Sequence, residues 1–205
     1  QPIRMDALRT ATFLPMLIVP ICIGLVGCRN FKDHRHMLAV TRLAHTDEMT
    51  GLANRRLFTA EATEQIQAQD FEANGLCVLI IDLDHFKSIN DRYGHSAGDD
   101  TLIHISRRMR DLLPKDALIA RLGGEEFAVM MPFGSFEDLH DMAESLRQGV
   151  ARSTCRSGRN LISVTISVGI GIVAADDTVS SVMSRADIAL YEAKAQGRNR
   201  FAIAA

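Results

Sequence analysis

Leu76-Cys77-Val78-Leu79-Ile80-Ile81 is an unbroken apolar run, and Asp82-Leu83-Asp84 follows it directly. Because no polar residue alternates with the apolar ones, the run predicts a β-strand that is covered on both faces. Layers of helices on the two sides of a central sheet provide such cover. The run therefore predicts an α/β fold.

Helical and extended patterns alternate on both sides of this strand. Apolar residues at helical spacing predict four helices, over residues 55–69, 98–113, 135–152 and 179–196. Short apolar or alternating segments predict three further strands, over residues 127–131, 162–172 and 201–204. Of these, 162–172 shows the clearest alternation. Together the elements predict a mixed central β-sheet flanked by helices.

The composition excludes several classes of protein. Hydrophobic residues make up 47% of the chain and charged residues 23%, which provides for a substantial core and excludes global disorder. The formal net charge of -2 argues against a nucleic-acid partner, so any phosphate must be bound by a local basic pocket. The cysteines lack C-x-x-C spacing, so neither a zinc site nor a disulfide framework is indicated.

The N-terminal part carries a different signal. Residues 10–28 have no charged residue and are mostly apolar, near the lower length limit for a transmembrane helix. More basic residues follow this segment closely than precede it, which favours a cytoplasmic C-terminal side. We therefore interpret residues 1–9 as a flank, 10–28 as a membrane span, 29–44 as a linker helix and 45–205 as the α/β domain. This predicts an inner-membrane protein whose α/β domain lies in the cytoplasm.

Two other interpretations of residues 10–28 stay open. The run is short enough to be a buried helix of a soluble protein. Leu25-Val26-Gly27-Cys28 also resembles the cleavage site of a bacterial lipoprotein signal.

Asp82 and Asp84 stand at the end of the apolar strand. Their i, i+2 spacing places both carboxylates on the same side of it. Carboxylates at such a position are costly unless something compensates their charge, and a divalent cation is the usual compensator. A solvent-exposed acidic strand end is the alternative.

A second acidic group follows a Gly-Gly pair in Arg121-Leu122-Gly123-Gly124-Glu125-Glu126-Phe127. Gly123 and Gly124 supply the positive φ angles of a tight hairpin turn and let a ligand approach the backbone closely. Glu125 and Glu126 are expected to point to opposite faces of the outgoing strand. Together with Asp82, such an acidic hairpin can hold Mg²⁺ beside a triphosphate. A hairpin that merely has a polar tip is the alternative.

Two further pairs have chemistry that suits a nucleotide. Lys194 and Arg198 lie at i, i+4 if the last helix persists, where both can bind phosphate oxygens, whereas a helix end capped by Gly197 is the alternative. Asn90 and Asp99 offer an amide and a carboxylate that match the edge of guanine. Asp99 also suits the N-cap of the helix that begins near it.

Taken in order, these segments resemble the GGDEF family of diguanylate cyclases. The matching segments are residues 47–55, 82–91, 94–99, 121–127, 167–170 and 191–199. The resemblance covers residues 45–203 and implies a fold like that of nucleotidyl cyclases and polymerase palms. It also implies a homodimer in which each subunit carries one GTP, with cyclic di-GMP, a bacterial second messenger, and pyrophosphate as products.

The resemblance also implies a role for individual residues. The metal ligands would be Asp82, the backbone carbonyl of Leu83 and Glu125, with Mg²⁺ as the cofactor and Mn²⁺ as its alternative. The catalytic residues would be Glu125, Glu126 as the alternative to it, and Lys87. The substrate-binding residues would be Asn90, His95, Asp99, Lys194, Arg198, Gly123 and Gly124.

One departure from the family pattern affects regulation. Many relatives carry an inhibitory Arg-x-x-Asp motif that ends six residues before the first glycine of the turn. Pro114 and Ala117 occupy those two positions here. We therefore expect the primary inhibitory product site to be absent.

Two other functions compete with an active cyclase. One is a non-catalytic module that binds GTP or a partner protein, but it would not require every site residue to be intact. The other is a cyclase with a different nucleotide, although Asp99 favours guanine because adenine presents an acceptor at N1.

Overall fold

The structure is a computed structural model that describes residues 45–68 and 75–204. The membrane span expected over residues 10–28 and the linker helix expected over 29–44 lie outside the described residues. Within the described ranges, no helix combines the length and the apolar character needed to cross a membrane.

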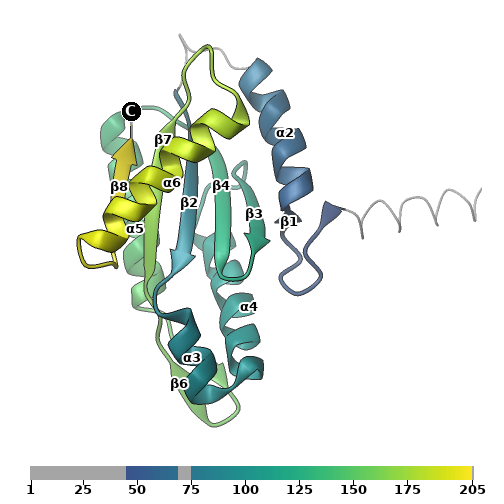
Figure 1. Cartoon of the computed structure of the whole chain (residues 1–205), viewed down its shortest axis with the longest axis vertical. Helices are drawn as coiled ribbons and strands as arrows, with labels where there is room; N and C mark the ends of the chain where they lie inside the picture. Colours follow the sequence, from purple (N-terminus) through teal and green to yellow (C-terminus); the bar gives the residue numbers. More distant parts are fainter. Residues whose placement is uncertain (1–44, 69–74, 205) are drawn as a thin grey trace, which may run out of the picture. The chain divides into compact units, whose positions relative to one another are not determined.

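A six-stranded mixed sheet forms the centre of the domain, with the strand order β1-β3-β4-β2-β7-β8 (Figure 1). The strands are β1 (Ala53–Asn54), β2 (Gly75–Leu83), β3 (Leu118–Gly123), β4 (Glu126–Phe133), β7 (Ile166–Ile172) and β8 (Phe201–Ala204). β2 runs antiparallel to both β4 and β7, whereas the β1–β3 and β7–β8 pairs are parallel. The mixed sheet predicted from the sequence is therefore confirmed.

Helices cover both faces of the sheet, as the apolar run predicts. The helices are α2 (Arg55–Ala68), α3 (Phe86–Tyr93), α4 (His95–Leu112), α5 (Phe136–Ala151) and α6 (Val179–Ala195). Cys77, Leu79 and Ile81 of β2 join the core formed with α4 and α5. Val78 and Ile80 point the other way, into the core formed with α2 and α6, and Figure 1 shows α6 crossing in front of the sheet.

Two helix predictions need correction. α4 begins at His95, three residues before the expected start at Gly98, and α3 precedes it as a separate short helix that the sequence patterns did not predict. Gly94 separates the two helices at φ 86°. The alternative role of Asp99 as a helix N-cap is therefore wrong, because Asp99 lies inside α4.

The strand predicted over residues 162–172 is also wrong as a single element. Asn160–Ile162 forms β6, which pairs with β5 (Cys155–Ser157) in a separate two-stranded sheet, and only Ile166–Ile172 joins the main sheet. The link between β6 and β7 turns toward the end of β2, where the Thr165 carbonyl accepts a hydrogen bond from the Asp84 N–H at 2.9 Å. Val164 is buried within this link, so the apolar alternation continues through the break.

Candidate active site

Asp82 and Lys194 form an ion pair at one end of the sheet. Asp82 is the second-last residue of β2, and Lys194 lies in the last turn of α6. The Lys194 Nζ is 2.8 Å from the Asp82 Oδ2, and the Asp82 side chain is only 12% exposed. The structure thus brings a predicted phosphate-binding cation directly onto a predicted metal ligand.

The Gly-Gly turn lies beside this pair. Gly123 and Gly124 adopt φ angles of 145° and 53°, which confirms the predicted positive-φ turn between β3 and β4. The Leu83 N–H donates a 3.4 Å hydrogen bond to the Glu125 carbonyl, so the turn is joined to the end of β2. Glu125 belongs to the turn, and β4 begins at Glu126. The expectation that the two glutamates occupy opposite faces of one strand is therefore wrong.

Glu125 is electrostatically coupled to both members of the ion pair. Burial raises the pKa of Glu125, the Asp82 carboxylate raises it further, and the Lys194 ammonium lowers it. Glu126, which is exposed, also raises the pKa of Glu125. Asp82, Glu125 and Lys194 therefore form one cluster of charges, which we call the charge cluster.

The charge cluster suits a hard divalent cation. Mg²⁺ is usually bound through one or two carboxylates together with substrate phosphates and water. Asp82 and Glu125 are two such carboxylates, and the Lys194 ammonium lies beside Asp82. Among the described residues no group of three or more His, Cys, Asp or Glu side chains is placed to hold a metal. Further ligands of a cation here would come from substrate or water.

Asp84 does not share in this cation site. Its carboxylate accepts hydrogen bonds from the Thr165 and Ser167 hydroxyls, each at 2.6 Å, and from the Asn199 N–H at 3.0 Å. The interpretation of Asp82 and Asp84 as two ligands of one cation is therefore wrong, because hydrogen bonds compensate the charge of Asp84.

The two predicted guanine-reading residues lie on adjacent helices. Asn90 is on α3 and Asp99 is exposed on α4, next to Gly98. Gly98 is packed against Asn90 so closely that a Cβ added there would lie 2.0 Å from the Asn90 Oδ1. The Asn90 amide therefore lies beside the first turn of α4.

Lys87 and His95 are exposed near the starts of α3 and α4. In the part of the chain that the structure describes, neither side chain forms a hydrogen bond or ion pair with Asp82 or Glu125. The described residues therefore show no direct contact of Lys87 or His95 with these two carboxylates.

Arg198 is not where the helical spacing predicts. α6 ends at Ala195, the Gly197 N–H donates to the Lys194 carbonyl at 3.3 Å, and the Arg198 N–H donates to the Ala193 carbonyl at 3.1 Å. This pair of bonds is the Schellman motif of a helix C-terminus. The i, i+4 pairing of Lys194 with Arg198 is therefore wrong, and the alternative of a cap at Gly197 is confirmed.

Asp47 and Arg121 support the Gly-Gly turn, although no role was predicted for either residue. Arg121 donates from Nε and Nη2 to the Gly124 carbonyl at 3.0 and 2.7 Å, and its Nη1 lies 3.2 Å from the Asp47 Oδ2. Burial acts to raise the pKa of Asp47, but hydrogen bonds from Thr50 and the Arg121 guanidinium lower it overall. The contact joins residues that are 74 positions apart, so no local pattern indicated it.

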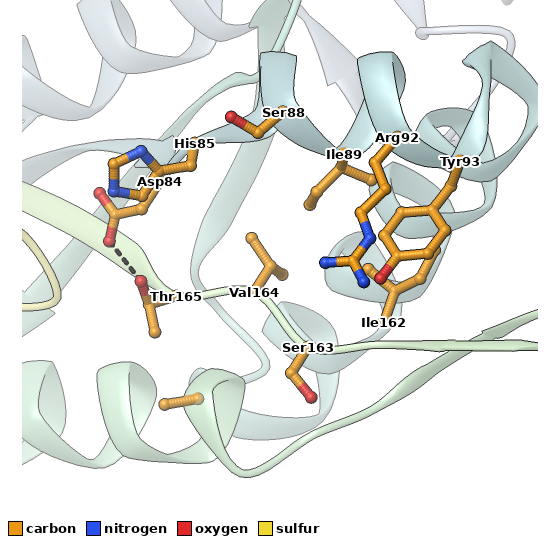
Figure 2. Close-up of a pocket in the computed structure, with 11 residues that line it drawn as sticks. Asp84, His85, Ser88, Ile89, Arg92, Tyr93, Ile162, Ser163, Val164 and Thr165 are labelled. Atoms are coloured by element: carbon orange, nitrogen blue, oxygen red, sulfur yellow. Dashed lines mark hydrogen bonds between the residues drawn. The ribbon is translucent and has the colours of Figure 1, made fainter.

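A cavity of about 320 Å³ lies along α3 (Figure 2). His85, Ser88 and Arg92 line one side of it, and the link between β6 and β7 lines the other. Asp84 also lines this cavity, whereas Lys87 and Asn90 do not.

Two curated proteins are similar to this chain in sequence. Diguanylate cyclase DgcM of Escherichia coli (strain K12) is 40% identical over 158 residues, which cover 77% of this chain and 38% of DgcM. Cyclic di-GMP phosphodiesterase NbdA of Pseudomonas aeruginosa is 34% identical over 171 residues, which cover 83% of this chain and 22% of NbdA. The chain thus spans less than half the length of either relative.

A solved structure shows the same fold. The coiled coil and GGDEF domain of DgcB from Caulobacter crescentus, crystallised in complex with c-di-GMP, matches with a TM-score of 0.81 at 28% identity. The match covers 92% of this chain and 99% of that one. The family model described as "Diguanylate cyclase, GGDEF domain" matches residues 44–200. The chain therefore belongs to the GGDEF domain family of diguanylate cyclases.

Proposed function

We infer that the chain is a diguanylate cyclase that condenses two GTP molecules into cyclic di-GMP and two pyrophosphates. The observation that carries this inference is the charge cluster, in which Asp82 and Glu125 meet Lys194 at the Gly-Gly turn. Membership of the GGDEF family supplies the substrate class.

The reaction is two reciprocal nucleotidyl transfers. The 3′ oxygen of each GTP attacks the α-phosphorus of the other, so that a P–O bond forms, the bond to pyrophosphate breaks, and the 3′ proton is released. One domain holds a single set of the required residues, so two subunits must face each other. We therefore propose a homodimer as the active species.

The charge cluster would act on the reacting groups. Asp82, the Leu83 carbonyl and Glu125 would hold Mg²⁺ or, as the alternative, Mn²⁺, which supplies Lewis acidity at the phosphate and the 3′ oxygen when bound. Glu125 would accept the 3′ proton, and its raised pKa would make it a better base than an ordinary glutamate.

Cationic side chains would neutralise the triphosphate. Lys194 lies beside the carboxylates, Lys87 is on α3, and Arg198 follows α6. Fixed positive charge around a phosphoryl group is expected to be a main source of rate in this chemistry. His95, near the start of α4, would contact the nucleotide.

Asn90 and Asp99 would select guanine. A carboxylate at Asp99 accepts hydrogen bonds from the guanine N1–H and exocyclic amine, and adenine offers an acceptor at N1 instead. The packing of Asn90 against Gly98 keeps the two helices close enough to act on one base.

The product distribution from GTP tests this function. The full chain would be incubated with GTP and Mg²⁺ under conditions that force dimerisation, and the products identified by mass spectrometry. Cyclic di-GMP and pyrophosphate are expected. Failure to turn over GTP in an enforced dimer would overturn the proposal.

A second function is a non-catalytic module that binds GTP. It is favoured by one observation, the similarity to NbdA, a protein named as a cyclic di-GMP phosphodiesterase rather than a cyclase. Binding of GTP without turnover, measured by calorimetry on the same sample, would select this alternative.

We also propose that residues 10–28 anchor the chain in the inner membrane with the domain on the cytoplasmic side. The support is the uncharged apolar segment and the basic residues that follow it. We expect the full chain to need detergent to stay in solution, and a chain that lacks residues 1–28 to stay in solution without it.

A further inference from the structure

Asp84 is a buried carboxylate whose two oxygens are both occupied. It is 4% exposed and directly follows β2. The Thr165 hydroxyl and the Asn199 N–H donate to Oδ2, and the Ser167 hydroxyl donates to Oδ1 (Figure 2 shows the bond to Thr165). Among the described residues no Lys, Arg or His forms an ion pair with Asp84, so these hydrogen bonds alone compensate its charge.

The bond to Asn199 holds a segment with unusual backbone geometry. Gly197, Arg198 and Asn199 have successive φ angles of 113°, 64° and 46°. Side chains other than glycine enter this region at a cost in free energy, so such a conformation persists only where the surrounding structure holds it.

Arg198 lies between two anchors of this segment. The first is the Schellman motif at the end of α6, formed by the Gly197 and Arg198 N–H groups. The second is Asn199, whose N–H donates to Asp84 and whose Oδ1 accepts a 2.7 Å hydrogen bond from the Arg147 Nη1.

Arg147 is itself held in place by its own helix. Its Nε and Nη2 donate to the Glu144 carboxylate at 2.8 and 2.6 Å. Hydrogen bonds from Arg147 and Gln148 lower the pKa of Glu144 to about 2. Glu144 is therefore ionised throughout the physiological range, and the guanidinium keeps one orientation toward Asn199.

We propose that Asp84 is a positioning residue, which fixes Arg198 relative to the end of β2 by holding the Asn199 backbone. β2 carries Asp82 and Leu83, so the same carboxylate ties the metal-binding edge to the segment that carries a phosphate ligand. Arg147 is the second positioning residue, acting on Asn199 from α5. The inference rests on the proposed function, in which Arg198 binds the triphosphate of GTP.

Asp84→Asn tests the proposal with little change in volume. The amide oxygen of Asn can still accept two hydrogen bonds, but it carries no negative charge, so it holds the Asn199 N–H more weakly than the carboxylate does. In steady-state assays of the full chain with Mg²⁺, we expect the KM for GTP to rise about tenfold while kcat changes less than about threefold.

A double-mutant cycle shows whether Asp84 acts through Arg198. Arg198→Gln is expected to raise the KM, and adding Asp84→Asn should raise it no further. Fully additive effects on log KM would overturn the proposal. Ile170→Val, a core change on β7, is the matched control and should leave the KM unchanged.

If Asp84→Asn does not fold, a double-mutant cycle of Arg147→Gln with Arg198→Gln tests the same proposal. The Arg147 side chain is half-buried, but its partners Glu144 and Asn199 lie outside the apolar core, so its loss should not prevent folding. The expected result is a smaller rise in KM that disappears in the Arg198→Gln background. An unchanged KM would contradict the anchoring of Arg198 through Asn199.

Hydrogen exchange of the Asn199 amide separates this inference from the proposed function. Followed by NMR without nucleotide, exchange should become at least about tenfold faster in Asp84→Asn and stay unchanged in Ile170→Val. Absence of product from the wild-type chain would contradict the proposed function and leave this readout intact. Unchanged exchange in Asp84→Asn would overturn the positioning role whatever the activity.

Discussion

At the scale of single residues, the active site depends on the balance of three charges. Asp82 and Glu125 are two carboxylates at neighbouring chain segments, and Lys194 compensates only one of them directly. Burial, and after it the repulsion from Asp82, raise the pKa of Glu125. A site with surplus negative charge binds a divalent cation more tightly than a neutral one.

Glu125→Gln should abolish turnover without unfolding the protein. Loss of the carboxylate proposed as metal ligand and base is expected to lower kcat by at least about a hundredfold. The melting temperature should not fall, because ionised Glu125 is repelled by Asp82. Pyrophosphate release and thermal unfolding measure the two effects.

Glu126→Gln is the matched control for this change. Glu126 is exposed and stands next to Glu125, so we expect its amide variant to keep most of the activity. An inactive Glu126→Gln beside an active Glu125→Gln would transfer the catalytic role to Glu126. Asp82→Asn, which removes the other predicted ligand, should be inactive and folded.

The pH profile of the enzyme should reflect Glu125. A raised pKa means that the carboxylate takes up its proton at a higher pH than an ordinary glutamate, so activity falls earlier on acidification. Lys194 lowers this pKa. The acid limb of kcat/KM should therefore move to higher pH in Lys194→Gln, whatever the loss in absolute rate. An acid limb that does not move would show that Lys194 does not act on the ionisation of Glu125.

At the scale of elements, α6 is placed by its close approach to β7. A Cβ at Gly169 would lie 2.0 Å from the Ala186 carbonyl oxygen and 2.2 Å from the Leu190 nitrogen. These are backbone atoms of α6, so they cannot rotate out of the way as the end of a side chain could. The absence of a side chain at Gly169 therefore sets the distance between α6 and β7. That distance in turn allows Lys194 to reach Asp82.

Gly169→Ala should destabilise the fold and weaken the site together. We expect a loss of about 3 kcal/mol in unfolding free energy from overpacking, measured by urea denaturation, and a rise in the KM for GTP. Gly134→Ala is the control, since its Cβ would meet only the Asp138 carboxylate at 3.2 Å. Equal stability of the two variants would show that α6 can move away from β7 at little cost.

At the scale of the whole molecule, regulation by product depends on a surface that differs from many relatives. Pro114 and Ala117 line a cavity of about 500 Å³ together with Arg110 and Lys115. Arg110 is engaged there with the Gly51 carbonyl at 2.7 Å. The carboxylate and guanidinium of the usual inhibitory motif are missing from this place.

Cyclic di-GMP should therefore bind weakly to the full chain. We expect no submicromolar affinity by calorimetry and little inhibition of initial rates at micromolar product. Pro114→Arg combined with Ala117→Asp restores the two motif residues and should tighten binding. Submicromolar affinity of the unmodified chain would contradict the prediction.

Strong local patterns determined much of the fold in advance. The apolar run of β2 predicted a strand covered on both faces, and the Phe58, Ala62 and Ile66 stripe predicted the buried face of α2. Gly123 and Gly124 predicted their own positive-φ turn. These features depend on residues that are close in sequence, because the period of a helix or strand and the sterics of a turn act over a few residues.

Only the tertiary structure decided which groups compensate each charged side chain. Asp84, which the sequence presented as a partner of Asp82 around a cation, is satisfied by Thr165, Ser167 and Asn199. Lys194 pairs with Asp82 because Gly169 lets α6 pack close to the sheet. The sequence by itself therefore determined the elements and the residue types of the site. Their pairing required the folded chain, because a charge is compensated by whichever groups lie near it in space, however far apart they stand in sequence.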